Sequence, residues 1–163
     1  MKVAIGVKMI AFTAMTLGAY NEYRGWIQPI NENPETEGYL VEYLGQGNKN
    51  HDNHDNYISW TLGSVFDAAY FPIEVNDKIS KNDVEQFMVQ GIPTKLGAKT
   101  TALTVTTLTG FDIIGLASCV DPKNYDIEIG SDIAKREVVD KLWGHLGFVL
   151  QWAKNGLKAK SNS

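Results

Sequence analysis

The sequence has very little cysteine, since Cys119 is the only one among 163 residues. A single cysteine excludes disulfide frameworks and cysteine-rich zinc sites within one chain. Disulfides belong to oxidising compartments, so this composition fits a protein of the reducing cytoplasm.

Long apolar runs are missing as well. No stretch approaches the roughly 20 consecutive apolar residues that a membrane helix needs. The apolar start of the chain is interrupted by Lys8, and no small-residue cleavage site follows it. We therefore expect a first β-strand over residues 3–12, and neither a signal peptide nor contact with a membrane.

Positive charge is not in excess, because the sequence has 15 Lys and Arg residues against 19 Asp and Glu residues and therefore a net charge of −4. Nucleic-acid polymers bind mainly to clustered Lys and Arg, so we expect no such partner. The sequence also has no nucleophile elbow, phosphate loop, dinucleotide fingerprint or paired zinc motif. We expect a protein that is not an enzyme and uses no cofactor.

One pair of residues bears on catalysis. Cys119 and His145 could in principle act as nucleophile and base, but such pairs are recognised by geometry, which spacing does not supply. Burial of Cys119 at the end of a strand is the favoured interpretation.

The patterns that are present predict an α+β fold. In the first half they predict strands over residues 39–44 and 57–60 as an antiparallel pair, beside the first strand. Thr16 is expected to cap a helix over residues 17–24 that ends at Gly25, and Thr61 a helix over residues 62–70.

The second half contains the unit around which the chain is organised. Ser80 and Asp83 have the spacing of a capping box and predict a helix over residues 81–90, followed by a loop over 91–99. Two strands, 101–108 and 111–120, then form a β-hairpin that turns at Thr109-Gly110. A long C-terminal helix runs to Lys154, with a bend or a break into two helices expected at Gly144 and Gly147.

These elements give small antiparallel sheets with short helices, ending in a hairpin followed by a long helix. We expect one domain over residues 1–71, a second over residues 80–156, and a frayed tail over residues 157–163.

A polar loop, residues 45–56, carries His51 and His54 beside Asp52 and Asp55. Imidazole and carboxylate groups are suitable ligands for a divalent metal. Asn and Asp are also the residues that loops favour for backbone reasons, and a short histidine tract is only a compositional signal. We favour the ordinary loop and expect no metal site.

The long helix has a basic side at Lys135, Arg136 and Lys141. These side chains could bind phosphate groups of a small ligand, and an aromatic ring such as Phe111 or Tyr125 could stack on a base.

An alternative interpretation comes from the spacing of opposite charges on the same helix. Asp132 precedes Arg136 by four residues, and Glu137 precedes Lys141 by four, which is typical of solvated ion pairs. Spacing alone favours this alternative.

One pattern resembles a family of small, functionally uncharacterised phage proteins. It comprises Gly110-Phe111, the run from Gly115 through Ala-Ser-Cys-Val-Asp-Pro to Asp126, Glu128-Ile-Gly130, Ile133-Ala134 and Lys141-Leu-Trp143. That family occurs in N-four-type phages, Shigella phages and many prophages, and the resemblance covers residues 80–155. The first half is similar to a segment that precedes several unrelated small phage domains.

The hairpin with its C-terminal helix also resembles phage anti-Thoeris proteins of the sponge type. Those proteins bind cyclic nucleotide signals without cleaving them and assemble as homo-oligomers. The resemblance implies a ligand site formed by Phe111, Arg136 and Lys141, and a homo-oligomer.

The function expected from these resemblances is that of a phage anti-defence accessory protein. It would bind and sequester a cyclic nucleotide immune signal in the host cytoplasm. Two alternatives stay open: an inhibitor that binds a host defence protein directly, as anti-CRISPR proteins do, and a structural phage protein without a small ligand.

Overall fold

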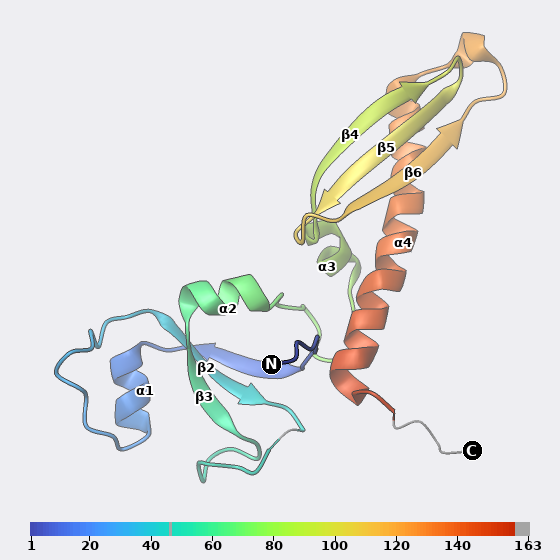
Figure 1. Cartoon of the computed structure of the whole chain (residues 1–163). Coiled ribbons are helices and arrows are strands. Elements are labelled where there is room, and N and C mark those ends of the chain that lie inside the picture. The colour runs from blue at the N-terminus through green and yellow to red at the C-terminus, as the bar shows by residue number, and fades with distance from the viewer. Residues whose placement is uncertain (46, 159–163) are drawn as a thin grey trace. The chain divides into compact units, whose positions relative to one another are not determined.

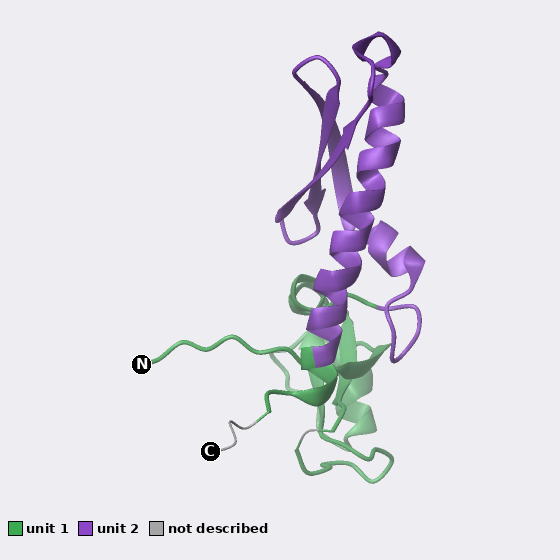
Figure 2. Cartoon of the chain, turned by 90° about the vertical axis from the view of Figure 1, so that its right-hand side faces the viewer, with its two compact units in different colours: residues 1–72, 152–163 green, residues 73–151 purple. Residues whose placement is uncertain are grey.

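The computed structural model describes residues 1–45 and 47–158 of the chain. The chain forms two compact units, unit 1 over residues 1–72 and 152–163 and unit 2 over residues 73–151 (Figure 2). Most of the tail expected over residues 157–163 lies outside the described residues.

Unit 1 contains an antiparallel three-stranded sheet with the order β1-β2-β3 and two short helices (Figure 1). Its elements are β1 (Ile10–Ala14), α1 (Leu17–Tyr23), β2 (Gly38–Tyr43), β3 (Ile58–Leu62) and α2 (Gly63–Ala69). Tyr20 of α1 packs with Leu40 of β2, whereas Phe66 of α2 stacks on Tyr39 at 4.1 Å between ring centroids. Neighbouring residues of a strand point to opposite faces, so α1 and α2 cover opposite faces of the sheet.

The antiparallel pair predicted over residues 39–44 and 57–60 is confirmed, with Tyr39 opposite Thr61. Thr16 caps α1 by accepting the N–H of Ala19, and Gly25 adopts a φ of 67° after the helix, both as predicted. The cap predicted at Thr61 is wrong, because Thr61 belongs to the ladder of β3 and Leu62 holds the cap position without a side-chain bond.

The first strand begins later than predicted, at Ile10 instead of Val3. Ile10 pairs with Tyr43, which is the last residue of β2. One further backbone bond continues the pairing, from the N–H of Leu44 to the carbonyl oxygen of Met9, and the described residues before Met9 belong to no strand.

Unit 2 contains a second antiparallel sheet with the order β4-β5-β6 and two helices (Figure 1). Its elements are α3 (Lys81–Gln86), β4 (Met88–Leu96), β5 (Thr100–Thr107), β6 (Asp112–Ser118), a 3-10 turn, η1 (Pro122–Asn124), and α4 (Ile127–Asn155), which belongs to unit 2 up to Gln151. The predicted hairpin corresponds to β5 and β6, and Asp126 starts α4 by accepting the N–H groups of Glu128 and Ile129. The α+β fold class is confirmed.

The core of unit 2 lies between one face of the sheet and α4. It consists of apolar side chains buried to more than nine-tenths: Val84, Leu103, Val105, Ile113, Ala134, Val138, Leu142 and Leu146. The helix approaches the sheet most closely at two glycines. A Cβ on Gly115 would collide with the carbonyl oxygen of Ala134, and one on Gly130 would collide with the hydroxyl of Thr101.

Three predictions for unit 2 are wrong. Residues 91–99 are largely the strand β4 and not a loop, because an edge strand tolerates Pro93 and Gly91. The helix predicted to residue 90 ends at Gln86, where the chain enters that strand. The break expected near Gly144 and Gly147 is absent, since α4 is one helix of 29 residues.

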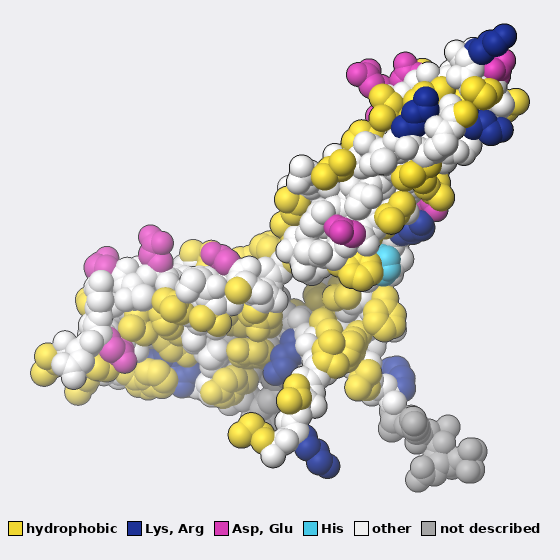
Figure 3. Space-filling model, turned by 45° about the horizontal axis from the view of Figure 1, so that its top comes forward, with side chains coloured by type: hydrophobic (Ala, Val, Ile, Leu, Met, Phe, Trp, Pro, Cys, Tyr) yellow, Lys and Arg dark blue, Asp and Glu magenta, His cyan; other side chains and the backbone are white. Residues whose placement is uncertain are grey.

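The other face of the β4-β5-β6 sheet carries no helix of unit 2. Ile92, Leu96, Ile114 and Leu116 point to this face and are each about half exposed. In the space-filling view, hydrophobic side chains, uncharged polar side chains and backbone cover much of the visible surface of unit 2, and charged side chains gather mainly at its upper end (Figure 3).

Candidate functional site

Phe111 lies in the turn between β5 and β6, and the residue is 64% exposed. The turn is fixed by Thr107, whose backbone N–H and hydroxyl both donate to the carbonyl oxygen of Phe111. The ring meets His145 of α4 edge to face, with 6.2 Å between centroids. An exposed aromatic ring is thus held beside an imidazole at one end of the sheet.

Lys141 lies one helical turn before His145, on the same side of α4. Its ammonium group forms an ion pair of 2.8 Å with Glu137 and donates to the carbonyl oxygen of Ile114 at 2.7 Å. Glu137 in turn accepts the N–H of Leu116 at 2.7 Å. The two side chains therefore bind backbone groups along β6, and the predicted ion pair at this spacing is confirmed.

The pKa of Glu137 is held below its usual value, first by the hydrogen bond from Lys141 and then by the N–H of Leu116. The carboxylate stays charged at neutral pH and keeps the ammonium of Lys141 in place. Lys141 is still about 45% exposed, so a second anion can reach it.

Arg136 is exposed and lies five residues before Lys141. Five residues correspond to a rotation of about 140° around a helix, so the two side chains leave α4 on different sides. The described part of the chain shows no ion pair between Arg136 and Asp132, so the second predicted pair is not formed. The structure thus joins Phe111 to His145, one helical turn after Lys141, and places Arg136 on another side of the helix.

Two other sequence interpretations concern this unit. The Cys119 thiol follows the far end of β6 from Phe111 and donates to the carbonyl oxygen of Asp121, so it does not meet His145. Tyr125 donates or accepts a hydrogen bond with Thr101, and the Lys95 ammonium lies 4.3 Å from its ring centroid. Tyr125 is therefore engaged at the other end of the sheet.

Residues 71–153 match the family model described as "Phage protein (N4 Gp49/phage Sf6 gene 66) family". The match covers half of the chain and includes Phe111, Lys141 and His145. The chain belongs to this phage protein family. No curated protein and no solved structure shows a significant match.

The family match confirms the resemblance expected for the second half of the chain. No helix among residues 1–45 and 47–158 of this phage-family protein is both long and apolar enough to cross a membrane. The expected homo-oligomer and the absence of enzymatic activity stay predictions.

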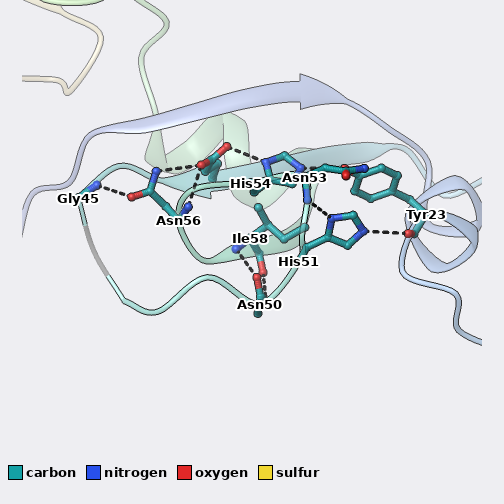
Figure 4. A network of polar contacts seen from close by, with 9 residues as sticks. Tyr23, Gly45, Asn50, His51, Asn53, His54, Asn56 and Ile58 are labelled. Atoms are coloured by element: carbon teal, nitrogen blue, oxygen red, sulfur yellow. Dashed lines mark hydrogen bonds and ion pairs between the residues drawn. The ribbon is translucent and has the colours of Figure 1, made fainter.

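Outside the matched residues, the predicted histidine loop forms a polar network with α1, β2 and β3 of unit 1 (Figure 4). His54 contacts a carboxylate oxygen of Glu42 in β2 through Nδ1 at 2.7 Å and the hydroxyl of Tyr23 in α1 through Nε2 at 3.0 Å. A carboxylate only accepts, so Nδ1 carries the proton and, in neutral His54, Nε2 accepts from Tyr23.

Further contacts complete this network. Glu42 accepts the backbone N–H and the side-chain amide of Asn56, at 3.1 and 2.8 Å. The ring of His51 stacks on Tyr23 with 4.4 Å between centroids. Among the residues described, no group of three or more His, Cys, Asp or Glu is placed to hold a metal ion. Asn50 of the loop also exchanges two hydrogen bonds with the backbone of Ile58, so the network ties the loop to α1, β2 and β3.

The sequence pattern indicated the two histidines but neither Glu42 nor Tyr23. Tyr23 lies 31 residues from His54, and Glu42 lies 12 residues from it. One feature of the sequence could have indicated Glu42, because it is a charged residue within a predicted strand.

The network predicts a specific dependence of stability on pH. The hydrogen bond from His54, followed by that from Asn56, lowers the pKa of Glu42 below its usual value of 4.5. A lowered pKa contributes stability that is complete above the unfolded value and is lost as the pH falls through the folded value. Glu42→Gln should therefore cost about 1 kcal/mol at pH 7, and the difference from wild type should vanish in strong acid.

Urea unfolding of both proteins between pH 7 and pH 3 measures this difference. Glu35→Gln, at an exposed position of the same unit, is the matched control and should match wild type throughout. A cost of Glu42→Gln that stays constant down to pH 3 would contradict the assignment.

Proposed function

We propose that this phage-family protein is an anti-defence accessory protein that binds a cyclic nucleotide immune signal in the host cytoplasm and sequesters it without cleavage. Membership of the phage family supports the phage origin. The observation that supports the ligand class is the exposed side chain of Phe111 beside His145, a residue that lies one helical turn after Lys141 on α4.

The chemistry of this site suits a nucleotide. Every base has a π-face, and stacking on an aromatic side chain contributes about 1–3 kcal/mol per base. The exposed ring of Phe111 offers such a face, and His145 offers a ring nitrogen for hydrogen bonding. The ammonium group of Lys141, which precedes His145 by one helical turn on α4, supplies a positive charge for a phosphate.

Glu137 limits how strongly Lys141 can bind a phosphate group of the proposed ligand. Its carboxylate neutralises the ammonium, and the two together hold β6 against α4. Lys141 is therefore held in position but contributes only modestly to binding of the nucleotide. Stacking on Phe111 supplies most of the affinity for that ligand. Arg136, on another side of the helix, contributes little to this site.

The ligand is sought by thermal unfolding of the full chain with a panel of cyclic dinucleotides, cyclic oligonucleotides and cyclic ADP-ribose isomers. A ligand at about 100 times its Kd stabilises the native state by about 2.7 kcal/mol, which raises the Tm by several degrees. A flat Tm across the panel at millimolar concentration would overturn the proposal.

Substitutions test the site with the ligand found in that panel. Phe111→Ala should weaken its binding by about tenfold or more, because the stacking face is lost. Leu108→Ala, which truncates an exposed apolar side chain in the same turn, is the matched control. Arg136→Gln removes a charge without touching the site and should leave the affinity unchanged. Calorimetric titration measures each affinity, and equal losses in Phe111→Ala and Arg136→Gln would contradict the site.

A further inference from the structure

Unit 1 contains an open pocket with a volume of about 710 Å³ between α1, the loop that follows it and β3. Ligand pockets of proteins usually measure about 300–1,000 Å³. The lining residues that matter here are Tyr20, Arg24, Trp26, Glu32 and Trp60. All of them lie outside the residues that match the phage family.

Arg24 is half-buried at this pocket, and its guanidinium group lies over two aromatic rings. Its central carbon is 4.5 Å from the ring centroid of Trp26 and 5.9 Å from that of Tyr20. Its Nη1 also donates to the hydroxyl of Tyr20, at 3.4 Å. In the described part of the chain, no carboxylate forms an ion pair with Arg24.

Tyr20 does not serve as a counter-ion for this arginine. Burial raises the pKa of the Tyr20 phenol, against a smaller opposite effect of Arg24, so the phenol stays neutral at physiological pH. Among the described residues, the guanidinium group of Arg24 is therefore paired with neither a carboxylate nor an ionised phenol, although Glu32 also lines the pocket. A planar guanidinium group of this kind binds carboxylate and phosphate groups through parallel hydrogen bonds.

The aromatic walls of the pocket are held in place by backbone contacts. Trp26 is 54% exposed, yet its backbone N–H donates to the carbonyl oxygen of Asn21 and its ring meets that of Tyr20 edge to face. The indole N–H of Trp60 donates to the carbonyl oxygen of Met15 at 2.8 Å. A ligand ring thus meets indole surfaces that are already positioned.

We propose that this pocket binds a heteroaromatic ring that carries one phosphate or carboxylate group. The ring lies against Trp26, and the anionic group is bound by Arg24. Glu32, which also lines the pocket, accepts hydrogen bonds from polar hydrogens of the ring or of an attached sugar. This site is separate from the nucleotide site proposed for unit 2 and does not depend on it.

Calorimetric titration of the full chain tests the site with four probes: adenosine monophosphate, adenosine, indole-3-acetate and inorganic phosphate. The monophosphate or the indole carboxylate should bind, and adenosine should bind about tenfold more weakly because it lacks the anion. Inorganic phosphate alone should not bind measurably. The relative affinities of the two anionic probes identify the phosphate or the carboxylate as the preferred group. No binding of either at millimolar concentration would overturn the proposal.

Variants separate this pocket from the rest of the chain. Arg24→Gln should lower the affinity for the anionic probe by about tenfold and leave the affinity for adenosine unchanged. Arg24→Lys keeps the positive charge but lacks the planar guanidinium group, so its affinity for the anionic probe should lie between those of wild type and Arg24→Gln. This second variant tests the site even if Arg24→Gln folds poorly. Lys2→Gln, a charge removed elsewhere in unit 1, should have no effect. Phe111→Ala should also have none, and a loss of probe binding in that variant would place the site in unit 2 and overturn the inference.

Discussion

Replacing Gly115 by alanine should destabilise unit 2 by about 3 kcal/mol or more. The new Cβ would collide with the backbone carbonyl oxygen of Ala134, and it would lie 2.9 Å from the carbonyl carbon and 3.0 Å from Cγ2 of Val138. Backbone atoms cannot rotate away as the end of a flexible side chain can. The helix α4 must therefore move off the sheet, and overpacking of this kind costs about 1–3 kcal/mol or occasionally more.

Gly144→Ala is the matched control for this substitution. Gly144 also lies in unit 2, within α4, but a Cβ there meets no atom within 4 Å. Alanine has the higher helix propensity, so this variant should be stabilised by about 0.5–1 kcal/mol. Hydrogen exchange at the backbone amides of β6, measured as a function of urea concentration, reports on the unfolding of unit 2 alone. A Gly115→Ala protein as stable as wild type would contradict the close packing of α4 on the sheet.

Replacing Asp83 by alanine should cost about 2–4 kcal/mol. Asp83 is 1% exposed, and its two carboxylate oxygens accept the N–H of Ser80 at 2.7 Å and the N–H of Glu74 at 3.0 Å. Ser80 completes the capping box by accepting the N–H of Asp83. Alanine would leave two partly buried N–H groups without an acceptor, and each such group costs about 1–3 kcal/mol.

The control for Asp83→Ala is Glu85→Ala in the same helix. Glu85 is about half exposed and forms only a surface ion pair of 3.7 Å with Lys81. Such pairs contribute little, so the loss should stay within about 0.5 kcal/mol. The free energy of unfolding from urea titrations of the three proteins measures both effects. A loss below about 1 kcal/mol for Asp83→Ala would show that the capping box does not hold α3 in place.

The sequence predicted those parts of the fold that depend on neighbours along the chain. The capping box of Ser80 and Asp83 and the cap at Thr16 are local signals, and both are confirmed. The strand β4 was missed because Gly91 and Pro93 are typical of loops, while its hydrogen bonds come from β5. Pairing with a distant strand overrode local propensity there.

The candidate site could be predicted only in part. The spacing of Glu137 and Lys141 indicated their ion pair, but it gave no sign that both side chains also bind the backbone of β6. The contact of Phe111 with His145 joins residues 34 positions apart, which only the packing of α4 on the sheet brings together. Spacing along α4 also shows why Arg136 stands apart, since five residues do not return to the same side of a helix.

The most direct test of the proposed function is to recover the ligand after binding. The full chain is incubated with the cyclic nucleotide that raises its Tm most, freed of unbound ligand by gel filtration and then denatured by heat. Chromatography with mass spectrometry identifies the molecule that is released. Sequestration predicts that the intact cyclic nucleotide is recovered in a stoichiometric amount, and that Phe111→Ala retains far less of it. Release of a linear or cleaved product, or of no nucleotide at all, would contradict sequestration.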